Sequence, residues 1–155
     1  MSAQIVNIQE RTLDGRLSSV LLSLSADWET EGSCWGYRKN TAEDLENRRV
    51  WTAEQNGRVI GYLFGLMETS KRSSSVMPES TPYFEIEEIY VCPEERNQQI
   101  GKRLFQAAEE DLRQEGQAAF VMLSTATKNW KAILHFYLDE LDMTFWNARL
   151  FKPLR

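Results

Sequence analysis

The chain has 155 residues, of which 42% are hydrophobic and 26% charged, an ordinary balance for a soluble globular protein. No apolar run approaches the ~20 residues of a membrane-spanning helix, and the amino terminus shows no secretory signal, so we expect a cytoplasmic protein with no membrane partner. The net charge of −5 argues against nucleic acid as a partner. A single histidine and two distant cysteines make a metal site unexpected.

The first half of the chain indicates a strand, two helices and a hairpin. Residues 4–10 are typical of a strand, and leucines at helical spacing predict a helix over residues 13–26. Thr41 begins a pattern with capping-box spacing, which predicts a short second helix. Residues 48–69 contain two β-rich runs joined by Asn-Gly, the strongest short signal for a hairpin.

The second half continues to alternate between strands and helices. The predicted elements are a loop over residues 71–82, a strand over 83–91, a helix from Ile100 to a stop at Gly116, a strand over 118–125, a helix over 129–141 and a final strand over 144–154. The chain is long enough for one domain with a real core and too short for two by default. We therefore expect a single α/β domain over residues 1–155.

Residues 92–105, CPEERNQQIGKRLF, combine basic and polar side chains with one glycine at a helix start. The first N–H groups of a helix have no intrahelical partner, so this segment predicts a phosphate site. Gln99 stands where a second glycine is expected, but backbone N–H groups do most of the binding. We expect Gln99 to adopt helical φ and ψ in the first turn and Gly101 to give the closest approach. The alternative is that Lys and Arg are simply helix formers on a solvated face.

This segment and a second motif resemble those of the GNAT superfamily of acyl-coenzyme A dependent N-acetyltransferases. The first motif matches at Val91, Pro93, Arg96, Ile100 and Gly101, and the second at Asn129, Ala132 and the pair Phe136-Tyr137. The resemblance implies the GNAT fold, a mixed sheet of about six to seven strands flanked by about four helices. It also implies acetyl-CoA as the acyl donor, with no metal.

The resemblance places coenzyme A along the strand that ends at Val91 and at the start of the next helix. The implied cofactor-binding residues are Ile89, Tyr90, Val91, Arg96, Asn97, Gln98, Gln99, Ile100, Gly101, Lys102, Asn129 and Phe136. The thioester carbonyl is expected near Ile89 and Tyr90. The family's glycine before the final strand is replaced by Asp142.

Two glutamates on this strand are the candidate bases. Strand alternation puts Glu85 and Glu87 on one face with Ile89 and Val91. We expect Glu87 to be the general base, directly or through a water, and Glu85 to be the second choice. The alternative is a solvent-exposed face without catalytic function.

Tyr137 is the candidate acid for the leaving thiolate, because a phenol is protonated at neutral pH. The family spacing, however, falls on Phe136. Either a π-bulge in the helix restores the alignment of Tyr137, or Phe136 occupies its position and the tyrosine is a core aromatic.

The acceptor is expected between residues 26–40 and 68–82. The first segment contains Asp27, Trp28, Glu29, Glu31, Trp35 and Tyr37, a composition that suits a small cationic amine but also an ordinary acidic loop. A catalytically weak acyl-CoA-binding regulatory module and an acetyltransferase acting on protein N-termini or lysines remain open. The protein is expected to be a monomer or a homodimer.

Overall fold

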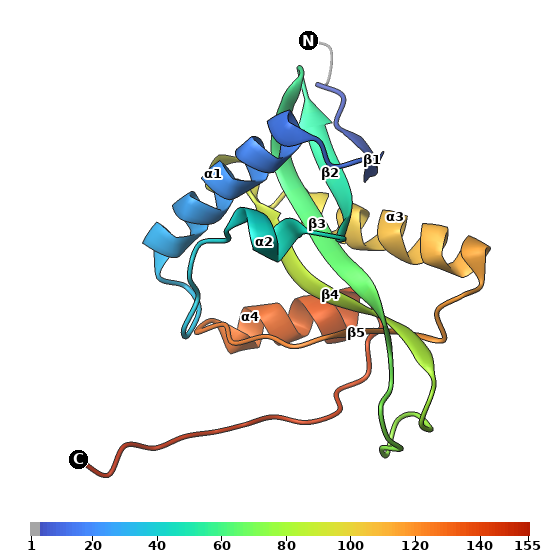
Figure 1. Cartoon of the computed structure of the whole chain (residues 1–155). Coiled ribbons are helices and arrows are strands. Elements are labelled where there is room, and N and C mark those ends of the chain that lie inside the picture. Colours follow the sequence, from blue (N-terminus) through green and yellow to red (C-terminus); the bar gives the residue numbers. More distant parts are fainter. Residues whose placement is uncertain (1–3) are drawn as a thin grey trace.

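The computed structural model describes residues 4–155 and contains a mixed sheet of five strands in the order β1-β2-β3-β4-β5 (Figure 1). The strands are β1 (Asn7–Arg11), β2 (Arg49–Gln55), β3 (Arg58–Thr69), β4 (Pro82–Val91) and β5 (Phe120–Leu123). The first four are antiparallel neighbours, and β5 runs parallel to β4. The α/β class is confirmed, with five strands in the described chain instead of six to seven.

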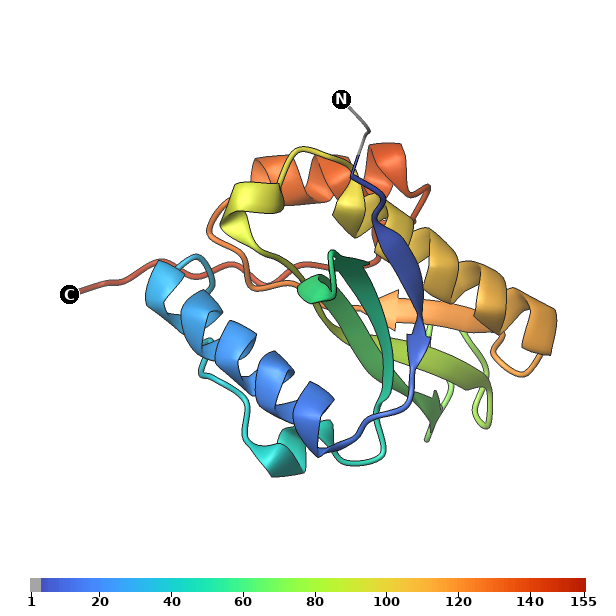
Figure 2. The same ribbon diagram turned by 90° about the horizontal axis from the view of Figure 1, so that it is seen from above.

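Helices cover both faces of the sheet (Figure 2). They are α1 (Gly15–Glu31), α2 (Ala42–Leu45), α3 (Ile100–Glu115) and α4 (Trp130–Leu134), which continues as a π-helix over His135–Glu140. A short 3-10 turn, Pro93–Glu95, follows β4. One core cluster joins the sheet to α3 and a second joins the opposite face to α1. Of the helices within residues 4–155, none combines the length and apolarity needed to cross a bilayer.

Helix α1 is longer than expected, since it ends at Glu31 and not near residue 26. Asp14 Oδ1 accepts a hydrogen bond from Leu17 N–H at 2.8 Å and so caps its first turn, and Gly32, with a φ of 61°, ends it in the left-handed region. The added turn carries Trp28, whose ring lies 4.3 Å from that of Tyr37. Packing of this aromatic side chain extends the helix beyond the leucine pattern.

The predicted final strand over residues 144–154 is wrong. The chain from Thr144 to Arg155 is extended but pairs with no strand of the described chain, and in Figure 1 it runs away from the sheet. A β-rich sequence becomes a strand only where a partner edge is within reach. The strand predicted over 118–125 is likewise reduced to the four residues of β5.

Candidate functional site

Strands β4 and β5 are paired over only a short distance. Tyr83–Ile86 pair with Phe120–Leu123, and residues 87–91 of β4 have no partner on that side among the residues described. Phe136 and Tyr137 of the π-helix pack against the same core cluster as the end of β4. The sheet therefore opens between β4 and β5, with the π-helix beside the opening.

Backbone groups of β4 face this opening. Cys92 N–H donates to Ile60 O on β3 at 2.8 Å. Residues that bond to one neighbouring strand alternate along an antiparallel strand, so Tyr90 is the next to bond to β3. The N–H and C=O of Ile89 therefore point away from β3 into the opening. They are free to bind an extended ligand.

Gln99 lies before the first turn of α3, not inside it as expected. Its φ is 63° and its ψ 19°, and Asn97 also has a positive φ, of 65°. Both residues occupy the left-handed region that glycine adopts most readily, which explains why a glycine is common at this place. Left-handed residues in a tight turn also help direct successive N–H groups toward one point.

The start of α3 supplies free donors at one end of the opening. The first backbone bond of the helix runs from Arg103 N–H to Gln99 O at 3.0 Å, so the N–H groups of Ile100, Gly101 and Lys102 precede the intrahelical pattern. A Cβ built on Gly101 would lie 3.5 Å from Phe136 Cζ, an ordinary contact. The fold itself does not require glycine here, so the small residue leaves room for a ligand.

The two basic residues of the motif differ in their environment. Arg96 is engaged by the protein, because it pairs with Glu31 at 2.7 Å, donates to Val91 O at 2.9 Å and lies over the ring of Tyr90. Its guanidinium fastens α1 to the end of β4. Lys102 has no ion pair among the described residues, so its ammonium group is the available cation at the helix start.

The helix contains a π-helical segment, the feature that the bulge alternative for the second motif requires. A π-helix holds one residue more per turn than an α-helix, and it begins at His135, just before Phe136 and Tyr137. Phe136 faces Gly101, and the two aromatic rings lie 5.2 Å apart. Burial raises the pKa of Tyr137 to about 12, so this phenol is protonated at neutral pH. Asn129, at the start of α4, is exposed.

The expected common face of Glu85, Glu87, Ile89 and Val91 is wrong. Phe64 and Gly65 of β3 pair with Glu88 and Ile86, so Glu87 is the extra residue of a β-bulge. The bulge reverses the alternation, and Ile89 and Val91 pack on the α3 side. Glu85 faces the α1 side together with Glu88.

Gly65 accommodates this bulge. A Cβ on Gly65 would lie 2.1 Å from the carbonyl oxygen of Glu85, closer than any real contact. Only glycine therefore allows β3 and β4 to approach at this point. Gly65, on the neighbouring strand β3, therefore fixes the position of the Glu85 backbone.

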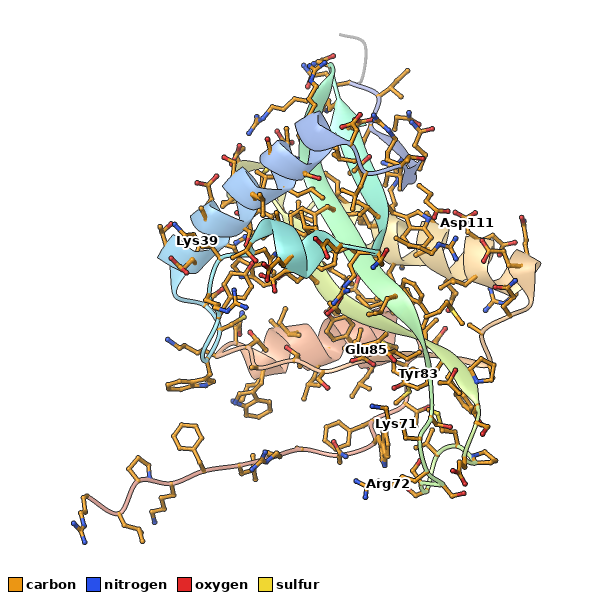
Figure 3. The ribbon with its side chains drawn as sticks, viewed as in Figure 1. Lys39, Lys71, Arg72, Tyr83, Glu85 and Asp111 are labelled. Atoms are coloured by element: carbon orange, nitrogen blue, oxygen red, sulfur yellow. The ribbon has the colours of Figure 1, made fainter. Side chains whose placement is uncertain are left out.

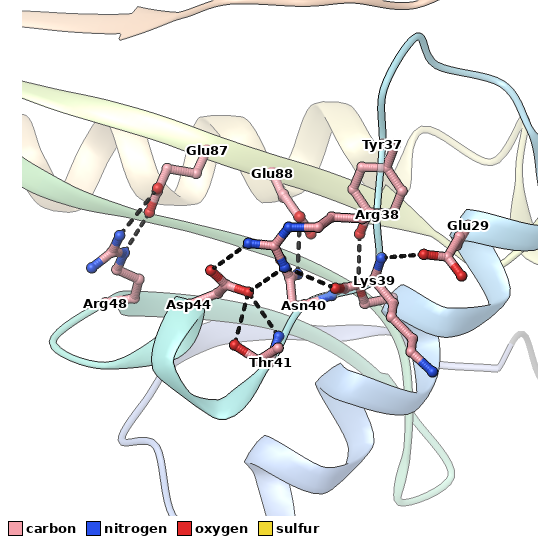
Figure 4. Close-up of polar contacts among 11 residues, drawn as sticks. Glu29, Tyr37, Arg38, Lys39, Asn40, Thr41, Asp44, Arg48, Glu87 and Glu88 are labelled. Carbon is pink, nitrogen blue, oxygen red and sulfur yellow. Dashed lines mark hydrogen bonds and ion pairs between the residues drawn. The ribbon is translucent and has the colours of Figure 1, made fainter.

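Glu87 is already paired within the protein. Its two carboxylate oxygens accept hydrogen bonds from Arg48 Nε at 2.5 Å and from Arg48 Nη2 at 3.2 Å (Figure 4). A bidentate guanidinium pair occupies the oxygens that a general base would use. Glu87 thus lies beside the site, with its carboxylate engaged.

Glu85 is the half-buried carboxylate without a hydrogen-bond partner in the part of the chain that the structure describes. Burial raises its pKa above the ordinary value for glutamate, and the nearby charges of Glu87 and Glu68 raise it further. Figure 3 labels Glu85 on the lower part of the sheet, close to Tyr83. The raised pKa makes this carboxylate a stronger base than an exposed glutamate.

Glu88 belongs to a buried polar network that the sequence did not indicate. It accepts hydrogen bonds from Tyr62 OH at 2.8 Å and Asn40 Nδ2 at 2.9 Å, and burial raises its pKa. Asn40 N–H donates to Ser25 Oγ, which also bonds Tyr37 OH at 2.6 Å. The network fastens residues 37–40 to α1 and β4 (Figure 4). Strict alternation would place Glu88 opposite Glu85, whereas the bulge brings both to the α1 side, so no local pattern could reveal this role.

The carboxylates of residues 26–40 are less available than expected. Glu29 accepts a hydrogen bond from Lys39 N–H at 2.6 Å, and Glu31 is paired with Arg96. Trp28 packs in the core against Tyr90, 5.3 Å away. Two of the three carboxylates of this segment are therefore already engaged by the protein.

An open groove of about 610 Å³ lies at the far ends of β3 and β4. Its lining residues are Met67, Glu68, Thr69, Ser70, Lys71, Glu79, Ser80 and Pro82. Glu68 lines this groove and lies near enough to Glu85 for its negative charge to raise the pKa of the Glu85 carboxyl. The groove is formed by residues 68–82, the second segment expected beside the acceptor.

Several solved structures that share the fold are acetyltransferases. An aminoglycoside N-acetyltransferase, AAC(6')-Iy, in complex with CoA has a TM-score of 0.68 and 15% identity, covering 99% of this chain and 97% of that one. An aminoglycoside acetyltransferase from an uncultured soil metagenomic sample, in complex with trehalose, has a TM-score of 0.66 and 17% identity over 97% of both chains. A ribosomal-protein-alanine N-acetyltransferase from Brucella melitensis biovar Abortus 2308 has a TM-score of 0.63 and 16% identity, covering 96% and 99%.

No curated protein sequence matches the chain significantly. At these low identities the solved structures establish the fold alone. The model of the acetyltransferase (GNAT) family, however, matches residues 17–141, which is most of the chain and includes nearly all of α1, the opening between β4 and β5 and the π-helix. The chain therefore belongs to the acetyltransferase (GNAT) family.

Proposed function

We propose that this protein transfers an acetyl group from acetyl-CoA to a primary amine, preferably a small cationic one, by direct attack in a ternary complex. One observation carries the proposal. The opening between β4 and β5 runs from free N–H donors at the start of α3 along residues 87–91 of β4, and just beyond it, where the pairing with β5 begins, lies a half-buried carboxylate, Glu85, with no hydrogen-bond partner among the described residues. Such a path can hold an extended anionic ligand with its reacting end beside a base.

The residues along the opening fit coenzyme A. The N–H groups of Ile100, Gly101 and Lys102, together with the Lys102 ammonium, would bind the pyrophosphate, and Gly101 leaves room for it. Backbone groups of Ile89 would pair with the pantetheine arm, with the exposed Asn129 as a further contact. Asn97, Gln98 and Gln99 form the turn, and Arg96 contributes by holding it in place. Bound acetyl-CoA would supply the acyl group as a thioester.

The catalytic roles follow from the same geometry. Glu85 takes the proton of the attacking amine, directly or through a water, and its raised pKa makes it a better base than an exposed glutamate. Ile89 N–H donates to the thioester carbonyl oxygen as negative charge develops there. Tyr137, protonated because its pKa is about 12, gives a proton to the leaving thiolate. We rank Glu85 above Glu87 as the candidate general base, because the Glu87 carboxylate is paired with Arg48. This reverses the ranking expected from the sequence.

The preference for a cationic acceptor rests on the charges that surround Glu85. Glu68 and Glu87 both act on its carboxyl, and Glu68 lines the groove through which an acceptor can approach. An ammonium group is attracted to this region, and its proton is then removed at Glu85. Lys71 lies at the outer part of the same groove (Figure 3) and disfavours a second positive charge far from the reacting amine.

The experiment is a measurement of CoA release from acetyl-CoA with a panel of acceptors. The panel contains diamines, aminoglycosides, free amino acids and peptides with a free N-terminus or a lysine. We expect turnover with at least one small cationic amine at a kcat/KM above those of the peptides. A higher value for a peptide would assign the protein to the protein acetyltransferases. Tight binding of CoA without turnover on any acceptor would instead indicate a regulatory acyl-CoA-binding module.

A further inference from the structure

Arg48 lies between α2 and β2, and its guanidinium is held at three points. Nε and Nη2 donate to the two carboxylate oxygens of Glu87 at 2.5 and 3.2 Å, and Nη1 donates to Glu46 O at 2.9 Å (Figure 4). Only 22% of the Arg48 side chain and 33% of the Glu87 side chain are exposed. A bidentate pair anchored in this way has a defined geometry, unlike a typical ion pair on an open surface.

The sheet itself does not need this pair. Strand β3 lies between β2 and β4 and pairs with both of them, so the backbone already fixes the two outer strands relative to each other. The side chain of Arg48 reaches past β3 to contact Glu87 on β4. Ion pairs near the surface add little to the stability of such a framework. The main consequence of the pair is therefore its effect on the carboxylates of the acceptor half.

Glu87 is closer along β4 to the expected thioester than the candidate base is. It lies two residues from Ile89, whose N–H points into the opening, whereas Glu85 lies four residues away. Glu87 is also the extra residue of the β-bulge, a feature that redirects a side chain and is frequent beside active sites. An unpaired carboxylate at this position would compete with Glu85 for the proton of the amine.

The charged groups that act on Glu85 from the sheet are negative. Burial raises the pKa of Glu85, and the charges of Glu87 on the same strand and of Glu68 on β3 raise it further. The neighbour on the other side, residues 120–123 of β5, contains no charged residue. The sheet therefore provides no cation that could balance these carboxylates.

Cations outside the sheet are few in this region of the described chain. Arg38 is paired with Asp44 on α2 and has 68% of its side chain exposed, and Lys71 lies at the outer end of the groove. Arg48 is the cation in direct contact with one of the carboxylates. Its hydrogen bonds to Glu87 raise the pKa of the guanidinium, which is therefore always charged. Arg48 thus balances the charge of Glu87 at every accessible pH.

We propose that Arg48 is a positioning residue that selects the general base: by holding the carboxylate of Glu87, it leaves Glu85 as the carboxylate that takes the proton of the amine. This inference rests on the proposed acetyl transfer and goes beyond it, because it assigns a function to a residue that contacts neither the substrate nor the reacting atoms. The pair also cancels much of the charge of Glu87, so that Glu85 loses its proton closer to neutral pH.

The test uses two substitutions, made singly and together. Glu85→Gln removes the base, and Arg48→Met replaces the guanidinium by an unbranched side chain without charge. In the double variant Glu87 is released, and kcat should be at least about 10-fold higher than in Glu85→Gln alone, a part of the ~10²–10⁴-fold that a general base contributes. Adding Glu87→Gln should remove this recovery. A merely structural Arg48 gives the opposite result, a double variant no faster than Glu85→Gln, and that result would overturn the inference.

A second measurement needs no acceptor. The side-chain carboxyl carbon of Glu85 is followed by NMR as the pH changes, with its signal assigned by its loss in Glu85→Gln. Arg48→Met should move the midpoint of this titration to higher pH, because the charge of Glu87 is no longer balanced. Turnover with an unchanged midpoint would overturn only the inference about Arg48. No turnover with any amine would refute the acetyl transfer, and the choice of base with it.

Two further variants are the controls. Arg48→Lys keeps the charge, so the titration midpoint of Glu85 should stay near that of the wild type. Arg38→Met removes an equal charge from an exposed arginine paired with Asp44 and should change neither the midpoint nor kcat. Equal shifts in Arg38→Met and Arg48→Met would show an effect of net charge alone and would overturn the assignment. Far-UV circular dichroism and CoA affinity confirm that Arg48→Met is folded.

Discussion

The candidate site has a cofactor half and an acceptor half, and the two differ in the chemical groups that line them. The cofactor half consists mainly of backbone groups from one continuous segment, the end of β4 and the start of α3. The acceptor half consists of side chains from β3, β4 and the α2–β2 connection, namely Glu68, Glu85, Glu87 and Arg48. The cofactor half should therefore tolerate most side-chain changes except at Gly101, whereas the acceptor half should respond strongly to single carboxylates.

The largest effect is expected at Glu85. Glu85→Gln should lower kcat by ~10²–10⁴-fold, the usual contribution of a general base, with little change in CoA affinity. In the wild type, the rate should fall as the pH drops through the Glu85 pKa, which burial holds above the ordinary value. This acidic limb should be absent from the variant, as measured by pH-rate profiles with one acceptor.

Stability gives an independent check on the same variant. Burial raises the folded-state pKa of Glu85, so its contribution to stability is present at low pH and is lost as the pH rises through that pKa. At neutral pH, Glu85→Gln should unfold no more easily than the wild type. Glu87→Gln is the matched comparison on the same strand, and a larger fall in kcat there than at position 85 would reverse the assignment of the base.

The next largest effect is expected in the cofactor half, at Gly101. Gly101→Glu should weaken CoA binding by about 100-fold, because it places bulk and negative charge where the phosphates would lie. The fold should survive, since a Cβ meets no atom closer than 3.5 Å. Gln106→Glu adds the same charge on the exposed side of α3 and is the control. If titration calorimetry gave the same CoA affinity for Gly101→Glu and Gln106→Glu, the start of α3 would not be part of the cofactor site.

A smaller effect is expected at Gly65, which belongs to the acceptor half although it has no side chain. Gly65→Ala should destabilise the protein by ~1–3 kcal/mol in urea unfolding, because its Cβ would collide with the Glu85 carbonyl oxygen. It should also lower kcat through displacement of Glu85. Gly15→Ala at the start of α1, where a Cβ meets nothing within 4 Å, is the control. A neutral Gly65→Ala would show that the bulge does not depend on this close approach.

The smallest effect is expected at Gln99. Gln99→Gly should raise the free energy of unfolding by up to ~1 kcal/mol, because it relieves a left-handed residue with a φ of 63°. CoA affinity should stay unchanged, since the backbone N–H groups remain. Gln98→Gly, where φ is not positive, should be neutral or slightly destabilising. A marked loss of affinity in Gln99→Gly would mean that the amide side chain of this residue binds the cofactor.

Local patterns in the sequence were sufficient for much of the fold. The Asn-Gly turn, the helix start at Ile100 and the stop at Gly116 depend on backbone preferences within a few residues, and all are found in the structure. The free N–H groups at the start of α3 were predictable for the same reason, because they are a local property of a helix start. Even the π-helix was one of two alternatives that the spacing of the second motif allowed.

The acceptor half and the conformation of residues 144–155 were decided by tertiary structure. The bulge at Glu87 depends on how β4 registers with Gly65 of β3, some twenty residues away, and it determines which glutamates face the acceptor side. The partnership of Glu87 with Arg48 and the burial of Glu88 follow from that register. The β-rich residues 144–154 formed no strand because pairing needs an edge within reach. The sequence by itself determined most of the elements and the place of the turn before α3, because these depend on short-range preferences. Side-chain neighbours and strand partners, including the lack of one for residues 144–154, depend on long-range contacts that only the folded chain defines.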